Sequence, residues 1–101
     1  MRSESETLEL KRSTSELKEG VISVTASLNK HRKGELYFGV RNDGAVLGQT
    51  VSEQTLRDVS RTLSERIEPR IYPKVEGVKL SGKGCIRVRF TGEEAPYLAF
   101  G

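Results

Sequence analysis

Two stretches of this 101-residue chain repeat apolar residues at helical spacing. The first stripe has spacings of four, three and four residues and predicts a helix from about Thr14 to about His31: Leu17, Val21, Val24 and Leu28. The second predicts a helix that Ser52 can cap and Pro69 can end: Leu56, Val59, Leu63 and Ile67. Each helix therefore has one apolar face, which must pack against another element.

Strand patterns surround the two helices. Residues 7–12 alternate polar and apolar, and the apolar run over 35–40 predicts a central strand that is buried on both faces. Gly34 is placed to cap the end of the first helix, and the turn signal over 41–44 predicts a β-hairpin with a short return strand over 45–48. Two further strands are predicted over 74–80 and 85–91. This order predicts an α+β fold in which both helices pack against one mixed sheet.

The composition excludes several classes of chemistry. Cys85 and His31 are single residues of their types, so the chain can form neither an internal disulfide nor a common zinc site nor a supported Cys/His nucleophile pair. Neither phosphate-binding glycine motif occurs, which excludes a P-loop ATPase. No apolar run is long enough to span a bilayer, and the N-terminus lacks the apolar core of a signal peptide, so we expect a cytoplasmic protein with no membrane partner.

The net charge of +3 is unevenly distributed. Residues 30–33 carry three basic groups and a histidine, and residues 71–92 carry five basic groups against one acid. Such blocks are compatible with binding a polyanion and equally with an ordinary solvated surface. Arg87 and Arg89 lie on the outward face of their predicted strand, where they can either pair with carboxylates on a neighbouring strand or meet phosphates.

An ordered set of short motifs covers nearly the whole chain: Glu4-Ser5, Glu9-Leu10-Lys11, Phe38-Gly39-Val40, Ile67-Glu68-Pro69 and Pro96-Tyr97. In this order they resemble the Schlafen AlbA_2 domain family. The resemblance implies an Alba-like two-layer α+β fold and a role in nucleic-acid binding. In bacteria and archaea such domains often form the N-terminal part of transcriptional regulators and RecG-helicase-related proteins. Members usually continue with a further strand, so we expect residues 1–101 to be a single domain excised from a longer protein.

The same resemblance raises a nuclease alternative. Schlafen nucleases use three carboxylates, of which two map onto Glu4 and Glu9, whereas Arg41 occupies the third position. A divalent ion, Mg²⁺ or Mn²⁺, would then bind the carboxylates, and Lys11 would stabilise the scissile phosphate. In an extended segment Glu4 lies roughly 16 Å from Glu9, so the chain must bend before Thr7. Cross-strand pairing on an exposed face is the structural alternative for Glu9 and Lys11. Because Arg41 replaces a metal-binding carboxylate with a cation, we rank catalysis below binding.

The leading hypothesis is a non-catalytic module that binds nucleic acid without a cofactor, and DNA is the expected partner. Its cationic side chains would neutralise phosphates with little dependence on base sequence. The residues predicted to form this interface are Lys30, Arg32, Lys33, Arg41, Lys79, Lys83, Arg87 and Arg89. Tyr37 and Phe38 are expected in the core instead of serving as stacking platforms. A protein-interaction domain, including a homodimer, is the third hypothesis.

Overall fold

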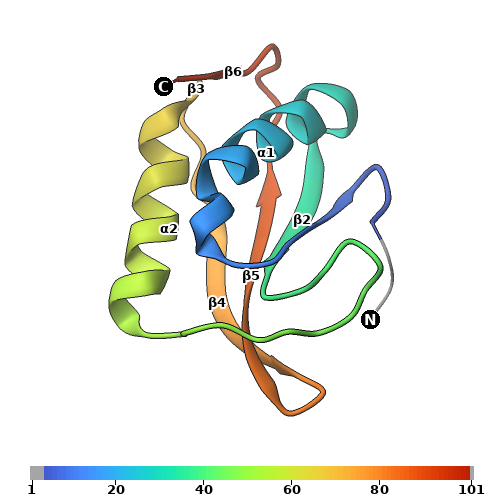
Figure 1. Cartoon of the computed structure of the whole chain (residues 1–101). Coiled ribbons are helices and arrows are strands. Elements are labelled where there is room, and N and C mark those ends of the chain that lie inside the picture. Colours follow the sequence, from blue (N-terminus) through green and yellow to red (C-terminus); the bar gives the residue numbers. More distant parts are fainter. Residues whose placement is uncertain (1–3, 101) are drawn as a thin grey trace.

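A mixed sheet of four strands forms one layer of the computed structural model, which describes residues 4–100 (Figure 1). Its strands lie in the order β1 (Leu8–Lys11), β2 (Lys33–Phe38), β5 (Lys83–Thr91) and β4 (Lys74–Leu80). β1 runs parallel to β2, whereas β5 is antiparallel to both β2 and β4. The prediction of one mixed sheet is confirmed, and so are four of the five predicted strand segments.

Two helices, α1 (Leu17–His31) and α2 (Glu53–Arg66), cover one face of this sheet (Figure 1). Helix α1 is the crossover that joins the parallel strands β1 and β2, a connection that two parallel neighbours require. The apolar stripes of both helices pack on alternate residues of the central strands: Val24, Leu28, Val59, Leu63, Leu36, Phe38, Ile86 and Val88. The predicted two-layer α+β architecture is therefore confirmed.

Helix α2 begins at the predicted cap, whereas α1 begins at Leu17, three residues after its predicted start, and its N-cap Glu16 makes no side-chain capping hydrogen bond. The Ser52 hydroxyl accepts a hydrogen bond of 3.1 Å from the Thr55 amide at the start of α2. Before α1, the chain forms a 3₁₀ turn, η1 (Thr14–Glu16), and the Ser13 hydroxyl accepts from the Ser15 amide at 3.1 Å. Helix α2 ends at Arg66, and the next residues form a short strand before Pro69.

The central strand β2 is buried on both faces, as predicted. Leu36 and Phe38 point toward the helices, and Tyr37 points to the opposite face. That face carries a second apolar cluster, formed by residues of β1, β2 and β5 and of the segment after β2: Leu8, Leu10, Tyr37, Val40 and Cys85. Tyr37 and Phe38 are thus core residues, which confirms the expectation.

The predicted return strand over 45–48 is wrong. The turn exists, since the Arg41 amide donates to the Ala45 carbonyl and the Gly44 amide donates to the Arg41 carbonyl. Beyond it, however, an isolated bridge between Val40 and Val46 replaces a strand ladder. The reason is that β1 and β5 already flank β2, so no free edge remains for a returning chain.

The assignment of Gly34 as a helix cap is also wrong. Arg32 takes the left-handed conformation at the end of α1, with φ of 66°, and its amide donates to the Leu28 carbonyl. Gly34 instead lies inside β2, where an added Cβ would approach Phe90 Cζ and Ser27 Oγ to 2.6 Å. Close packing between α1 and β5 is what requires glycine there.

A second, two-stranded sheet ties the C-terminal segment to the helices. It pairs β3 (Ile67–Glu68) with β6 (Leu98–Ala99), and the sequence analysis did not predict it. The Asn29 side chain on α1 hydrogen-bonds both the amide and the carbonyl of Tyr97, whose ring is buried. Within the described residues, neither helix has the length and apolarity that a membrane crossing demands.

Candidate functional site

A groove of about 530 Å³ crosses one end of the main sheet, the end toward which the β5 arrow points in Figure 1. The segments before β1 and β4, the starts of β2 and β4 and the end of β5 contribute its walls: Thr7, Lys33, Gly34, Glu35, Tyr72, Lys74, Arg89, Phe90 and Thr91. Strand pairing explains why these residues converge. Lys33 lies opposite Thr91, and Lys74 lies opposite Arg89, in the two antiparallel ladders.

Charged side chains from three strands gather beside this groove, on the sheet face opposite the helices. Side chains alternate along each strand, and the neighbours of these residues point into the helix-side core. The set contains four cations and two carboxylates, an excess of two positive charges: Lys33, Lys74, Arg87, Arg89, Glu35 and Glu76. We call this set, with Tyr72, the groove cluster.

Glu76 partly neutralises the groove cluster. Its Oε1 lies 2.6 Å from Arg87 Nη2 and 3.0 Å from Arg89 Nη2. The hydrogen bond from Arg87 is the main cause that lowers the pKa of Glu76, so the carboxylate stays ionised at neutral pH. The predicted alternative for the outward arginines, pairing with a neighbouring strand, is confirmed. Two guanidinium groups share one carboxylate, however, and the cluster stays cationic.

The eight basic residues predicted as an interface lie in separate parts of the fold. Lys33 and Arg89 line the groove, Arg87 lies next to them, and Arg32 directly precedes Lys33. Three others lie toward the opposite end of the sheet, near the β4–β5 turn or in the turn after β2: Lys79, Lys83 and Arg41. Arg89 and Lys83 are six residues apart on β5, roughly 20 Å along the strand.

Three of the residues outside the groove have local partners. Lys30 Nζ lies 3.6 Å from Glu6 Oε1, and Arg41 pairs with Asp43 two residues away. Lys83 Nζ donates to the Val46 carbonyl oxygen at 3.3 Å. The predicted interface is therefore divided, and the part with the highest local density of cations is the groove cluster.

Four members of the groove cluster were missed as site residues by the sequence analysis: Glu35, Glu76, Lys74 and Tyr72. Lys74 was assigned only as the start of a strand, and Tyr72 was not considered. Tyr72 is 82% exposed, whereas the adjacent Ile71 is 3% exposed. A lone aromatic residue between the basic residues Arg70 and Lys74 is the signal that could have drawn attention to this segment.

A pair of carboxyl groups lies at the outer edge of β1. The backbone turns back over residues 5–8, where the Ser5 and Leu8 backbones exchange hydrogen bonds. This bend returns Glu4 to the strand, and its Oε2 accepts a hydrogen bond of 3.1 Å from the Leu10 amide. The bend that the nuclease alternative requires is thus present. Glu4 also satisfies a backbone donor on an edge strand, which is a structural role.

The surroundings of Glu9 favour its protonated form. Burial, the hydrogen bond with the Glu4 carboxyl and the Glu4 charge together raise the pKa of Glu9 to about 7, and Lys11 opposes this rise. Two carboxyl groups that share one site rarely ionise together, because like charges repel. Half-protonation near neutrality is a property that general acids and bases use, and structural clusters show it as well.

The residues around this pair do not fit a divalent cation. Mg²⁺ and Mn²⁺ prefer several oxygen ligands, whereas Arg41 stands where the family pattern has the third carboxylate. Asp43, the nearest carboxylate in sequence, is held by Arg41. Over residues 4–100, no group of three or more histidine, cysteine or acidic side chains is arranged to hold a metal ion.

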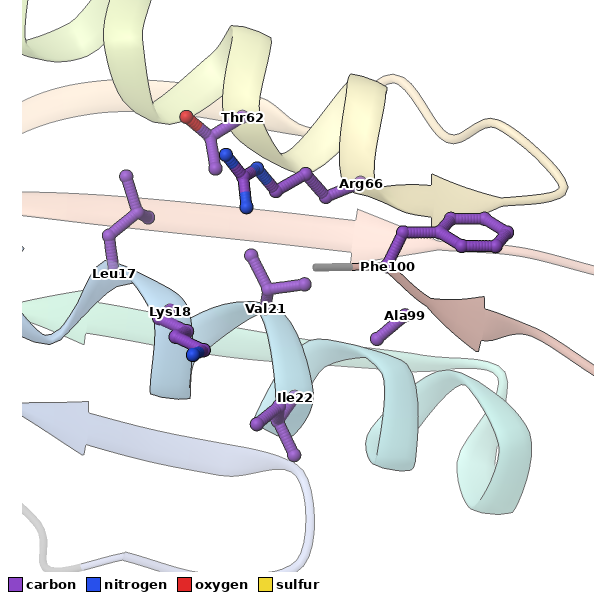
Figure 2. Close-up of a pocket in the computed structure, with 8 residues that line it drawn as sticks. All are labelled: Leu17, Lys18, Val21, Ile22, Thr62, Arg66, Ala99 and Phe100. Carbon is purple, nitrogen blue, oxygen red and sulfur yellow. The ribbon is translucent and has the colours of Figure 1, made fainter.

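A second concavity, of about 360 Å³, lies between the two helices and the C-terminal strand (Figure 2). Five of its eight lining residues are apolar, and the full lining is Leu17, Lys18, Val21, Ile22, Thr62, Arg66, Ala99 and Phe100. In Figure 2, Leu17 and Val21 of α1 and the Arg66 side chain of α2 point into the space between the helices. None of these side chains is an acid, a histidine or a cysteine, so this groove offers no acid–base pair.

Solved structures with the same fold are distantly related in sequence. The DIP2311 protein from Corynebacterium diphtheriae matches 91% of the chain with a TM-score of 0.72 and 13% identity, and the match covers 19% of that protein's chain. The N-terminal domain of a RecG-related protein from Nitrosomonas europaea matches 93% with a TM-score of 0.70 and 19% identity, over 76% of its own chain. At these identities the comparison concerns the fold alone.

Sequence comparison gives the family. No curated protein matches the chain. The family described as Schlafen, AlbA_2 matches residues 4–99, which is nearly the full length. The motifs that carried the resemblance in the sequence lie within this range, at the turn before β1, along β2, after α2 and before β6. The chain therefore belongs to the Schlafen AlbA_2 family.

Proposed function

We propose that this domain binds nucleic acid, with DNA as its expected partner, through the phosphate backbone at the groove cluster. The observation that carries the proposal is the convergence of Lys33, Lys74 and Arg89 from three adjacent strands on one groove. Long cationic side chains neutralise phosphates and release counterions, which gives affinity without reading the base sequence. The name of the Nitrosomonas neighbour relates that protein to the ATP-dependent DNA helicase RecG, which supports the same class of partner.

A salt series tests the proposal. Affinity for mixed-sequence DNA, in duplex and in single-stranded form, is measured by fluorescence anisotropy at increasing KCl. If three cations contact phosphates, log affinity falls against log salt with a slope of about −2 for single strands and about −3 for duplex. Binding that does not change with salt, or no binding at low salt, refutes phosphate recognition.

Charge-removing variants locate the contacts. Lys33→Gln combined with Lys74→Gln is expected to reduce the magnitude of the slope by about 1.4 to 1.8, since each phosphate contact contributes about 0.7 to 0.9. Arg57→Gln combined with Arg61→Gln is the matched control, because it removes the same number of charges from exposed positions on α2, across the sheet from the groove cluster. An equal loss in the control would mean that net charge, and not the groove, attracts the DNA.

The second candidate is a metal-dependent endoribonuclease of the Schlafen type, which the approach of Glu4 to Glu9 favours and Arg41 opposes. Incubation of structured RNA with the domain and Mn²⁺ or Mg²⁺ tests it. Cleavage that Glu9→Ala abolishes would replace binding with catalysis as the function. RNA that stays intact at high protein concentration excludes the nuclease.

A homodimer is the third candidate, and the apolar groove beside α1 favours it, since Ile22 and Phe100 are 57% and 50% exposed there. Light scattering over a range of protein concentrations measures the mass. A dimer that Ile22→Glu dissociates would support this role, and a monomeric mass at every concentration would exclude it.

A further inference from the structure

Tyr72 differs from the other two tyrosines in its exposure to solvent. Its relative exposure is 82%, against 8% for Tyr37 and 3% for Tyr97. The ring lies beside the groove, just before the first residue of β4, Lys74. A ring in this position lacks the burial that usually stabilises an aromatic side chain. Packing in the core therefore does not explain why position 72 is a tyrosine.

The backbone around Tyr72 is nevertheless held in place. Ile71 is 3% exposed and belongs to the helix-side core, and its carbonyl accepts a hydrogen bond of 3.0 Å from the Ser64 hydroxyl on α2. On the other side, Pro73 restricts the backbone and Lys74 enters the β4 ladder. The fold therefore fixes the chain on both sides of Tyr72 and directs its ring outward, which reduces the entropy lost when a ligand stacks on it.

Two cations that line the groove together with the ring, Lys33 and Lys74, are available to phosphates. No ion pair involves Lys33 or Lys74 within residues 4–100, and both side chains are exposed. The groove spans four strands, so its length across the sheet is roughly 14 Å, from three interstrand spacings. A surface of this size suits a short run of nucleotides.

We propose that the groove cluster binds single-stranded nucleic acid, with one unpaired base stacked on the Tyr72 ring and the adjoining phosphates held by Lys33 and Lys74. This inference rests on the proposed function and narrows its ligand. An exposed ring next to cations is the combination that single-strand binding uses, because every base has a flat face that stacks on an aromatic side chain. In a duplex those faces are covered by neighbouring base pairs, so Tyr72 adds nothing to duplex binding.

Tyrosine emission provides a direct readout of stacking. The chain contains no tryptophan and three tyrosines, of which only Tyr72 is exposed within the described residues. Titration with oligo-dT is expected to quench this emission. An abasic oligonucleotide of the same length is expected to bind through its phosphates without quenching. Oligo-dT is also expected to bind about tenfold more tightly than the abasic strand, since one stacked base contributes about 1–3 kcal/mol, or 5- to 150-fold.

Variants at the ring test its role. Tyr72→Ala is expected to lower oligo-dT affinity to that of the abasic strand without changing the slope against salt, and Tyr72→Phe is expected to keep the wild-type affinity. Tyr72→Leu separates stacking from apolar contact and should behave as the alanine variant does. Circular dichroism checks that each variant folds, which the exposure of the residue favours.

The outcomes separate this inference from the proposed function. Equal affinity for oligo-dT and the abasic strand, or a Tyr72→Ala variant that keeps wild-type affinity for oligo-dT, overturns stacking while salt-dependent phosphate binding stands. If neither strand binds at low salt, this inference fails, and the proposed function stands only if duplex DNA binds in the salt series. Titrations with oligo-dU and oligo-rU, which differ only in the 2′-hydroxyl, show which sugar the groove cluster prefers.

Discussion

Replacing Glu9 by glutamine removes a carboxyl group whose pKa the fold raises from 4.5 to about 7. Burial is the largest cause, and the neighbouring Glu4 carboxyl adds to it. In the unfolded chain the same group titrates near its ordinary value. Between about pH 4.5 and pH 7 the folded protein therefore binds more protons than the unfolded chain. By linkage, the free energy of unfolding falls as pH rises through this window.

The size of the effect follows from the change in pKa. At 1.36 kcal/mol per pH unit, the full rise corresponds to roughly 3 kcal/mol. Glu9 is only partly buried, so solvent screens the interaction, and we expect about 1–2 kcal/mol. The wild type should lose this amount between pH 4.5 and pH 8. Glu9→Gln has no titrating group there, and its amide can donate to the Glu4 carboxylate, so it should be more stable than the wild type at pH 8 by a similar amount.

Urea unfolding at pH 5, 6, 7 and 8 measures the free energy of unfolding of the wild type, of Glu9→Gln and of a control, Glu19→Gln. Glu19 is an exposed acid on the first turn of α1, so its replacement should leave the pH dependence unchanged. If the wild type and Glu9→Gln have parallel curves from pH 5 to pH 8, the raised pKa of Glu9 is refuted. If the control loses the pH dependence as well, a general charge effect accounts for the result.

Three further predictions concern packing, capping and charge. Gly34→Ala should lower the free energy of unfolding by about 1–3 kcal/mol, because its Cβ would overlap Phe90 and Ser27, and a stability equal to wild type in urea would contradict this packing. Ser52→Ala should cost about 1 kcal/mol through loss of the α2 cap, measured by thermal unfolding, and no change in Tm would show that the cap contributes nothing. Glu76→Gln should strengthen DNA binding and steepen its salt dependence in anisotropy, since two arginines lose their shared carboxylate, and unchanged binding would place those arginines outside the interface.

The candidate site was partly predictable from the sequence. The outward face of β5 follows from its alternation, which identified Arg87 and Arg89 correctly as surface cations with a possible carboxylate partner. Lys33 was chosen for its place in a basic run, and the structure places it in the groove. Lys74 was missed because only strand pairing places it opposite Arg89. Tyr72 was missed because its one local signal, an aromatic residue between two basic residues, does not show which way the ring points.

The predictions failed where the structure depends on strand pairing or packing between segments far apart in the sequence. A turn signal over 41–44 specifies a local reversal but not which strand lies beside β2, and β5, some 50 residues further along the chain, takes that place. Glycine is the residue type typical of a helix C-cap, yet the role of Gly34 depends on how closely α1 and β5 approach each other. The bend that joins Glu4 to Glu9 likewise became visible only in three dimensions.

The amino-acid sequence by itself determined the two helices, the Ser52 cap, four of the strand segments and the family, because periodicity and capping act between residues only a few positions apart. Tertiary structure alone decided which strands pair and which of eight dispersed cations meet at one groove. These depend on contacts between distant segments, whose energies arise from burial and close packing that no local pattern records.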